Sequence, residues 1–227
     1  MRELNAILDA WRSSRDAPGV LATVLHVEGS AYRRPGARML ISADGRARIG
    51  TISGGCLEGD LTKKAAWWTA QGDPVVRVYD TLSDEEAVWE FGLGCNGIIH
   101  VLLERVESSA TQALLAYLEG AQKARREVVI GTVLGAAPDC GHRTGDHLFG
   151  GPGAFPGPLE DAARETLNTR RSRLVHTPPA SVFVEAVASQ RSTTSSVLPV
   201  GSDSNGVVSE NASADRAPAG PDRVLKV

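Results

Sequence analysis

Two glycine-rich segments each carry a cysteine, and the first of them has residue types that suit the binding of an anion. It runs from Ser53 through Gly54 and Gly55 to Cys56, between an apolar run and a helical pattern. A helix N-terminus exposes partly positive backbone N–H groups, and paired glycines let a ligand approach them closely, so we expect an anion-binding loop here. Near the first helical turn the pKa of a thiol tends to fall, which would make Cys56 a reactive thiolate. A tight turn with a small buried cysteine fits the same residues.

Two polar side chains flank this segment. Ser53 is positioned to cap the helix that follows. Glu58, in the first helical turn, suits the positive end of the helix dipole and could act as a base. Both residues therefore join the candidate site.

The second segment contains Gly92, Gly94, Cys95 and Gly97, and it precedes an apolar run at 98–103. Three glycines and an asparagine in six residues indicate several positive φ angles, as in a loop shaped around a ligand or in a bulged turn. Cys95 lies 39 residues after Cys56, and the sequence leaves open whether the two thiols share one site.

A basic segment follows the apolar run 19–27 and contains Ser30, Arg33 and Arg38. Arginine side chains form paired hydrogen bonds with phosphate and carboxylate groups. A solvated basic loop is the simpler interpretation of any one of these arginines. The alternative gains weight if the segment lies beside Cys56, and the strand and hairpin patterns lead directly into that turn.

Metal and nucleotide motifs are weak or absent. Side chains of the types that bind zinc or copper occur at Asp139, Cys140, His142, Asp146 and His147. Their spacing matches no closed metal-binding pattern, so we expect no metal site. The glycine fingerprint of a dinucleotide-binding turn does not follow any strand pattern, so we expect no NAD site in this chain.

The hydrophobic periodicity predicts alternating helices and strands that would position these segments. Helices are expected near residues 4–11, 57–70, 111–122 and 159–167. Strands are expected at 19–27, 38–42, 47–52, 74–79, 98–103, 127–134, 147–149 and 181–187. Asp44-Gly45 between two of these strands predicts a hairpin with a type I′ turn. At least one antiparallel pair in a mixture of helices and strands indicates an α+β (mixed α/β) fold.

Composition narrows the class of protein. The chain has 227 residues, of which 42% are apolar and 22% charged, as in globular proteins. A net charge of -3 and the lack of a long apolar run argue against nucleic-acid and membrane partners. Three cysteines and an N-terminus unlike a signal peptide indicate a reducing, cytoplasmic location. Residues 188–227 are rich in Ser, Gly, Pro and Asp, which predicts a disordered tail.

Together, the segments GSAYRRPGARMLISADGRARIGTISGGCLEGDL and FGLGCNGIIHVLLE resemble the XdhC/CoxI family of accessory factors for molybdenum hydroxylases. The likeness is strongest over about residues 3–106 and continues more weakly to VFVE at 182–185. We therefore expect an XdhC/CoxI-like N-terminal domain at 1–106, an α/β extension of the same globular unit at 107–187, and the tail. Full-length relatives usually continue after VFVE into a Rossmann-type domain, and because a low-complexity segment follows VFVE here, we expect this chain to lack that domain.

The resemblance implies a function. Family members bind the molybdenum cofactor as cargo, protect it during terminal sulfuration and deliver it to an apo molybdenum hydroxylase such as xanthine dehydrogenase or CO dehydrogenase. They dock a cysteine-desulfurase-type sulfur donor and are commonly homodimers. The implied cofactor-binding residues are Ser30, Arg33, Arg38, Ser53, Gly54, Gly55, Cys56, Glu58, Gly92, Gly94 and Cys95.

Within this set, Arg33 and Arg38 with the helix start would hold the phosphate end of the cofactor. Cys56 and Cys95 would face the metal and its dithiolene sulfurs, because soft metals favour thiolate neighbours. Two alternatives remain open. Cys56 could instead be the catalytic residue of a sulfurtransferase or persulfide carrier, or the chain could be a truncated regulatory fragment that acts only by protein contact.

Overall fold

The computed structural model describes residues 2–15, 17–80, 97–137, 140–151 and 153–188. These residues belong to one compact unit, which spans Met1–Arg191. The predicted tail lies outside the described residues, except for Ala188. None of the described helices is long and apolar enough to cross a lipid bilayer.

The first half of the chain builds a five-stranded antiparallel sheet, here called sheet A, in the order β3-β2-β1-β5-β4. Its strands are β1 (Gly19–Gly29), β2 (Arg38–Ser42), β3 (Arg48–Gly50), β4 (Val75–Asp80) and β5 (Gly97–Arg105). The long strands β1 and β5 lie at its centre, where apolar residues occupy almost every position. This pattern indicates burial on both faces.

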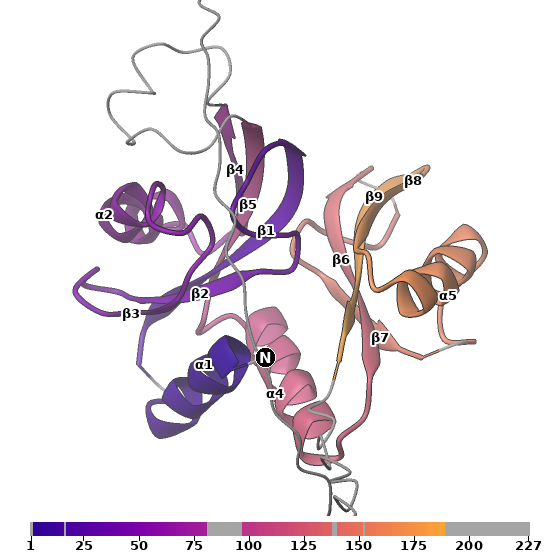
Figure 1. Cartoon of the computed structure of the whole chain (residues 1–227), viewed down its shortest axis with the longest axis horizontal. Helices are drawn as coiled ribbons and strands as arrows, with labels where there is room; N and C mark the ends of the chain where they lie inside the picture. Colours follow the sequence, from indigo (N-terminus) through magenta and orange to yellow (C-terminus); the bar gives the residue numbers. More distant parts are fainter. Residues whose placement is uncertain (1, 16, 81–96, 138–139, 152, 189–227) are drawn as a thin grey trace, which may run out of the picture. The chain divides into compact units, whose positions relative to one another are not determined.

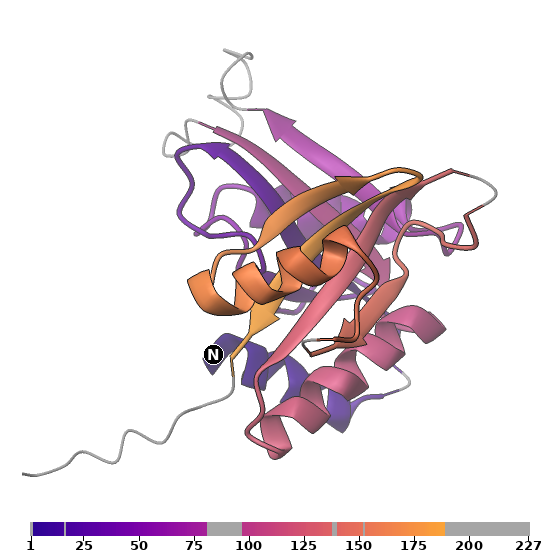
Figure 2. The same ribbon diagram turned by 90° about the vertical axis from the view of Figure 1, so that its right-hand side faces the viewer.

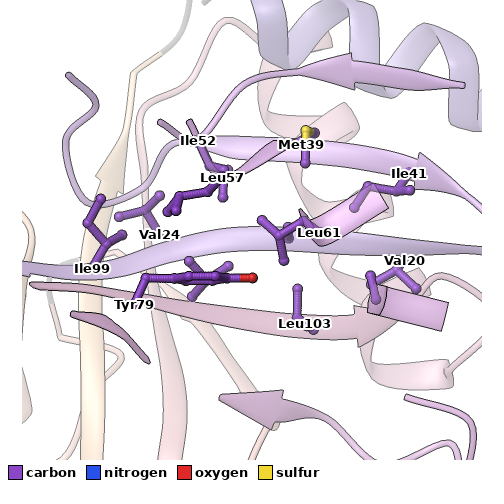
Figure 3. Packing of buried hydrophobic residues seen from close by; sticks show 13 residues of the cluster. Val20, Val24, Met39, Ile41, Ile52, Leu57, Leu61, Tyr79, Ile99 and Leu103 are labelled. Atoms are coloured by element: carbon purple, nitrogen blue, oxygen red, sulfur yellow. The ribbon is translucent and has the colours of Figure 1, made fainter. Parts of the chain in front are cut away.

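Helices cover both faces of sheet A. Helix α2 (Glu58–Trp68) packs its Leu61 and Ala65 against Val20 and Val24 of β1. Figure 3 shows Leu61 within this core. On the opposite face, α1 (Arg2–Ser13) and α4 (Ser109–Lys123) enclose Leu21. The helices therefore sandwich the sheet that carries the candidate loops (Figure 1).

The second half forms a four-stranded antiparallel sheet, sheet B, in the order β7-β6-β9-β8. Its strands are β6 (Val128–Ala136), β7 (His147–Gly150), β8 (Arg173–Thr177) and β9 (Ala180–Val187). Helix α5 (Pro158–Thr169) covers one face, as Figure 2 shows. The other face contributes Phe183 to a small core with Leu25 and Leu102 of sheet A. The two sheets are therefore in direct contact.

The structure confirms the α+β class and corrects one turn. Among the non-glycine residues that the structure describes, only Arg125 and Arg170 have positive φ, so Asp44 cannot be part of a type I′ turn. Gly45, at φ 67°, supplies the single left-handed residue, and five residues connect β2 to β3. The second hairpin strand is correspondingly shorter than predicted.

Candidate functional site

Strand pairing brings the basic segment to the start of β5. Gly29, at the end of β1, pairs with Gly97, at the beginning of β5. A side chain at Gly97 would overlap the carbonyl oxygen of Glu28, and its Cβ would lie 3.0 Å from the carbonyl oxygen of Ser30. Only glycine allows the chain to enter β5 here. Ser30 itself is exposed, next to the point where the backbone at Gly97 passes residues 28–30.

Gly97→Ala is expected to destabilise the protein by about 2 kcal/mol, because the added methyl group must push two backbone segments apart. Chemical denaturation would measure the change. Gly120→Ala is the matched control, because no atom lies within 4 Å of its added Cβ. That helical substitution should stabilise by up to about 1 kcal/mol. Equal stabilities for the two variants would contradict the close approach.

The basic segment also contacts the Gly54–Cys56 turn. A Cβ at Gly54, where φ is 84°, would lie 3.2 Å from Cβ of Tyr32. The ring of Tyr32 is 67% exposed. A Cβ at the neighbouring Gly55 would meet no atom within 4 Å. The two predicted segments are therefore side by side, with an exposed aromatic ring at their junction.

A network around Glu58 determines the conformation of this turn. Glu58 is the first residue of helix α2 and is buried, and its Oε1 accepts hydrogen bonds from the backbone N–H groups of Ile52, at 3.0 Å, and Ser53, at 2.9 Å. Oε2 accepts from the N–H of Gly55 at 2.9 Å. The hydroxyl groups of Thr51 and Ser53 donate to the same carboxylate. The carboxylate is therefore surrounded by five donors.

These contacts keep Glu58 ionised. Burial raises the pKa of the carboxyl group, but the hydrogen bonds from Ser53, Thr51 and the backbone outweigh it and lower the pKa to about 2. A carboxylate that holds its charge this strongly is a poor proton acceptor at neutral pH. The geometry therefore gives Glu58 a structural role and does not support its use as a base.

The same network changes the interpretation of the anion-binding loop. The N–H groups of residues 52, 53 and 55 already donate to Glu58, and the N–H of Leu57 donates to Oγ of Ser53 at 2.8 Å. Leu57 occupies the N-cap position of α2 and its side chain makes no capping hydrogen bond, so the cap predicted at Ser53 is wrong, although Ser53 supports the turn through the N–H of Leu57. A ligand anion could use the N–H groups on Glu58 only by displacing its carboxylate, so they do not form an open cradle.

Cys56 is half-buried and packs against the core beneath α2. Its sequence neighbour Gly55 is exposed, so Cys56 lies next to the solvent-exposed part of the turn. Gly92, Gly94 and Cys95 lie outside the described residues, so a site shared by the two thiols stays a prediction.

Arg38 does not face the Cys56 turn. Its Nη1 donates to Oε2 of Glu185 and to the carbonyl oxygen of Gly36, both at 3.2 Å, and its Nη2 pairs with Oε1 of Glu185. The side chains of Arg38 and Glu185 are 6% and 3% exposed. Arg38 therefore links sheet A to sheet B through a buried ion pair. Its Nη1 and Nη2 are taken by Glu185 and Gly36, and its buried Nε has no hydrogen-bond partner among the described residues, so the pair does not favour the predicted phosphate contact at the Cys56 turn.

Arg33 forms a more accessible ion pair. It bonds to Glu3 of α1, and the two side chains are 31% and 40% exposed. Arg33 and Arg38 line one pocket, which also contains Glu185 and is not lined by any of residues 53–58. The pocket that Arg33 and Arg38 share is thus not lined by the cysteine expected at the metal end.

The histidine of the weak metal motif has another partner. His147 Nε2 lies 2.8 Å from Oε1 of Glu104, and its Nδ1 lies 3.1 Å from Oγ1 of Thr132. Within the described ranges, no three His, Cys, Asp or Glu side chains are grouped to hold a metal ion. Asp139 lies outside those ranges. His147 thus forms a second buried polar link between the sheets.

Sequence reasoning missed Tyr32 and Glu185. Tyr32 lies within the basic segment, and its exposed position beside Gly54 depends on the packing of two loops that are separate in the sequence. Glu185 is 147 residues from Arg38, and no local pattern connects them.

The first part of the chain is similar to known proteins. The XdhC and CoxI family matches residues 13–80, which include the basic segment, the hairpin and Cys56. A protein from Bacillus subtilis (strain 168), named as a probable subunit of xanthine dehydrogenase, is 43% identical over 106 residues. These residues are 47% of this chain and 32% of the relative.

A solved structure is also similar. The crystal structure of a xanthine dehydrogenase from Bacillus halodurans matches with a TM-score of 0.58 and 28% identity, over 83% of this chain and 53% of that chain. The present chain spans about a third of the Bacillus subtilis relative and about half of the Bacillus halodurans chain. Residues 13–80 therefore confirm the resemblance to the XdhC and CoxI family.

Proposed function

We propose that this chain is a cytoplasmic accessory protein that binds the molybdenum cofactor and assists its sulfuration and insertion into a molybdenum hydroxylase such as xanthine dehydrogenase. The observation that carries the proposal is the family match over residues 13–80, which contains Cys56 in its glycine turn. Two similar proteins, named as a xanthine dehydrogenase and a probable subunit of one, support the choice of client. The client hydroxylase, a cysteine-desulfurase-type sulfur donor and a second copy of this chain are the proposed partners.

The surface at the Gly54–Cys56 turn suits part of this cargo. Molybdenum and dithiolene sulfur are soft, and a thiolate is a compatible neighbour. The open space at Gly55 lets a ligand approach the backbone beside Cys56. The exposed ring of Tyr32 offers a flat face against which a pterin ring system could stack.

The phosphate end of the cofactor needs a different contact from the one predicted. Glu58 accepts from the N–H groups of Ser53 and Gly55, and Glu185 pairs with the guanidinium of Arg38. The proposal therefore assigns the metal and ring portions of the cargo to Cys56 and Tyr32. It assigns no phosphate contact to the helix start.

Anaerobic gel filtration with the isolated molybdenum cofactor tests this proposal. Wild-type protein is expected to retain the cofactor, and Cys56→Ala should reduce retention about tenfold because it removes the thiolate neighbour. Cys140→Ala is the matched control, since Cys140 is also half-buried but lies outside the turn. Cys95→Ala tests whether the second predicted loop contributes to the same site.

Failure of folded wild-type protein to retain the cofactor would contradict cofactor binding and favour a regulatory fragment that acts by protein contact. Equal retention by wild type and Cys56→Ala would remove Cys56 from the site. Circular dichroism of each variant would separate these outcomes from unfolding.

Cys56 also supports a second candidate function, that of a persulfide carrier. The half-buried thiol next to the open space at Gly55 supports this candidate. In that reaction its thiolate attacks the outer sulfur of a donor persulfide, a new S–S bond forms on Cys56, and the donor cysteine leaves as a thiolate. Mass spectrometry should then find one added sulfur atom on the peptide of Cys56 and none on that of Cys140.

A further inference from the structure

A pocket of about 230 Å³ lies where four segments of the chain meet. Its walls come from α1, from the connection between β1 and β2, from the connection between α5 and β8, and from the end of β9. The arginines in these walls are Arg33, Arg38 and Arg170, and Ser172 adds a hydroxyl group. Because the segments are far apart in sequence, only the folded chain assembles this group.

The three arginines differ in how firmly they are held. Arg38 is buried with Glu185 and forms the closed floor. Arg33 pairs with Glu3, and Arg170, whose side chain is 49% exposed, pairs with Glu127. Exposed ion pairs contribute little to stability because water and salt screen them. The two outer guanidinium groups can therefore exchange their protein carboxylate for another anion at small cost.

Two further arginines are sequence neighbours of the pocket residues. Arg34 and Arg171 are each adjacent in sequence to a pocket arginine, and both are exposed. Neither forms an ion pair with any residue in the part of the chain that the structure describes. Their charges are thus available to attract an anion toward the pocket.

The remaining wall is apolar. Leu4 and Ile7 of α1 face the pocket together with Ala37 and Val187. A ligand that uses both kinds of wall must combine an anionic group with an apolar body. A pocket of this volume is smaller than the roughly 300–1,000 Å³ that encloses a drug-sized ligand, so it suits a small molecule or one end of a larger one.

We propose that this pocket binds a small phosphorylated or carboxylated molecule through Arg33 and Arg170, and that Glu3 occupies Arg33 when the ligand is absent. The site extends beyond the proposed cofactor function, because its walls contain neither Cys56 nor Tyr32. The apolar part of the ligand packs against Leu4 and Val187. Glu3, in the first turn of α1, is a competitor that the ligand displaces.

Isothermal titration calorimetry with phenyl phosphate, benzoate and inorganic phosphate tests the inference. Phenyl phosphate is expected to bind more tightly than inorganic phosphate, because its ring uses the apolar wall. The ratio of phenyl phosphate to benzoate affinity identifies which anionic group the arginines prefer. Amide shifts of residues 33–38 and 185–188 in nitrogen-15 spectra would place the binding at the pocket.

Substitutions of the two partners of the Arg33–Glu3 ion pair are expected to change the affinity for phenyl phosphate in opposite directions. A general loss of structure would instead weaken binding in both variants. Glu3→Gln should tighten phenyl phosphate binding about two- to fivefold, because it releases Arg33. Arg33→Gln and Arg170→Gln should each weaken it about tenfold. Arg164→Gln, which removes an exposed arginine of α5 outside the pocket walls, is the matched control and should leave the affinity unchanged.

Three outcomes would overturn the inference. They are no saturable binding of any probe, equal weakening by Arg33→Gln and Arg164→Gln, and no tightening in Glu3→Gln. Retention of the molybdenum cofactor is measured independently at Cys56, so either proposal can fail while the other stands.

Discussion

Glu58→Ala is expected to lower the free energy of unfolding by about 3 kcal/mol or more, the largest effect of any single substitution in the Gly54–Cys56 turn. It leaves the N–H groups of Ile52, Ser53 and Gly55 without their acceptor, and each buried donor left unsatisfied costs about 1–3 kcal/mol. Relaxation of the turn and entry of water into the space left by the side chain make the total loss smaller than the sum of the three separate costs. Urea denaturation at neutral pH would measure the change.

Glu160→Ala provides the matched control. Glu160 also accepts hydrogen bonds from backbone N–H groups, those of Gly153 and Phe155, ahead of a helix, but its side chain is more exposed. Water can replace the lost acceptor there, so we expect about 1 kcal/mol. A loss at Glu58 no greater than that at Glu160 would contradict the structural role of the buried network.

The same carboxylate makes stability depend on pH. The pKa of Glu58 is about 2 in the folded protein, below its ordinary value of 4.5. Its contribution is therefore fully present above about pH 4.5 and is lost as the pH falls toward 2. The stability of Glu58→Gln should change less than that of wild type over this window. Parallel curves for the two proteins would show that Glu58 is not the titrating group.

Breaking the buried Arg38–Glu185 pair is expected to destabilise the protein by about 3–5 kcal/mol from either side. Glu185→Gln leaves the guanidinium charge buried without a carboxylate, and Arg38→Met leaves the carboxylate without its cation. The double variant Arg38→Met/Glu185→Leu should recover most of the loss, because it removes both charges and fills the space with apolar atoms.

A double-mutant cycle by chemical denaturation checks this expectation. The exposed pair Arg173–Glu165 serves as the control, and its disruption should cost less than about 1 kcal/mol. Additive losses in the Arg38 and Glu185 variants would show that the pair is not coupled. In that case it would not be what holds the basic segment against sheet B.

The sequence predicted the elements well because their signals are local. Alternation of apolar residues located the strands, and the spacing of Leu57, Leu61 and Ala65 located α2. The hairpin turn was placed correctly, but its type was wrong. Asp-Gly is compatible with several turns, and the loop length that decides among them depends on where the flanking strands stop pairing.

The sequence predicted where the candidate site lies better than it predicted which of its groups are available to a ligand. Glycine positions indicated the turn, but the cap predicted at Ser53 was wrong, because Leu57 occupies the N-cap position. The capture of the same N–H groups by Glu58 was missed, although an acid shortly after Thr51 and Ser53 is a detectable signal. The commitment of Arg38 to Glu185 has no local signal, because it depends on how the two sheets pack.

The position of Glu185 on β9 has a consequence for how the protein is made. All strands of sheet A lie before residue 106, so they can pair early during synthesis, whereas β6 and β8 acquire the strand between them only after Val187 has been added. At ~5–20 residues per second, roughly 5–15 s separate these events on the ribosome. Throughout that interval Arg38 lacks its carboxylate partner, and of the two buried polar links between the sheets only the one between Glu104 and His147 has both of its residues. Sheet A must therefore tolerate a hydrated arginine on its inner face until the last described strand arrives.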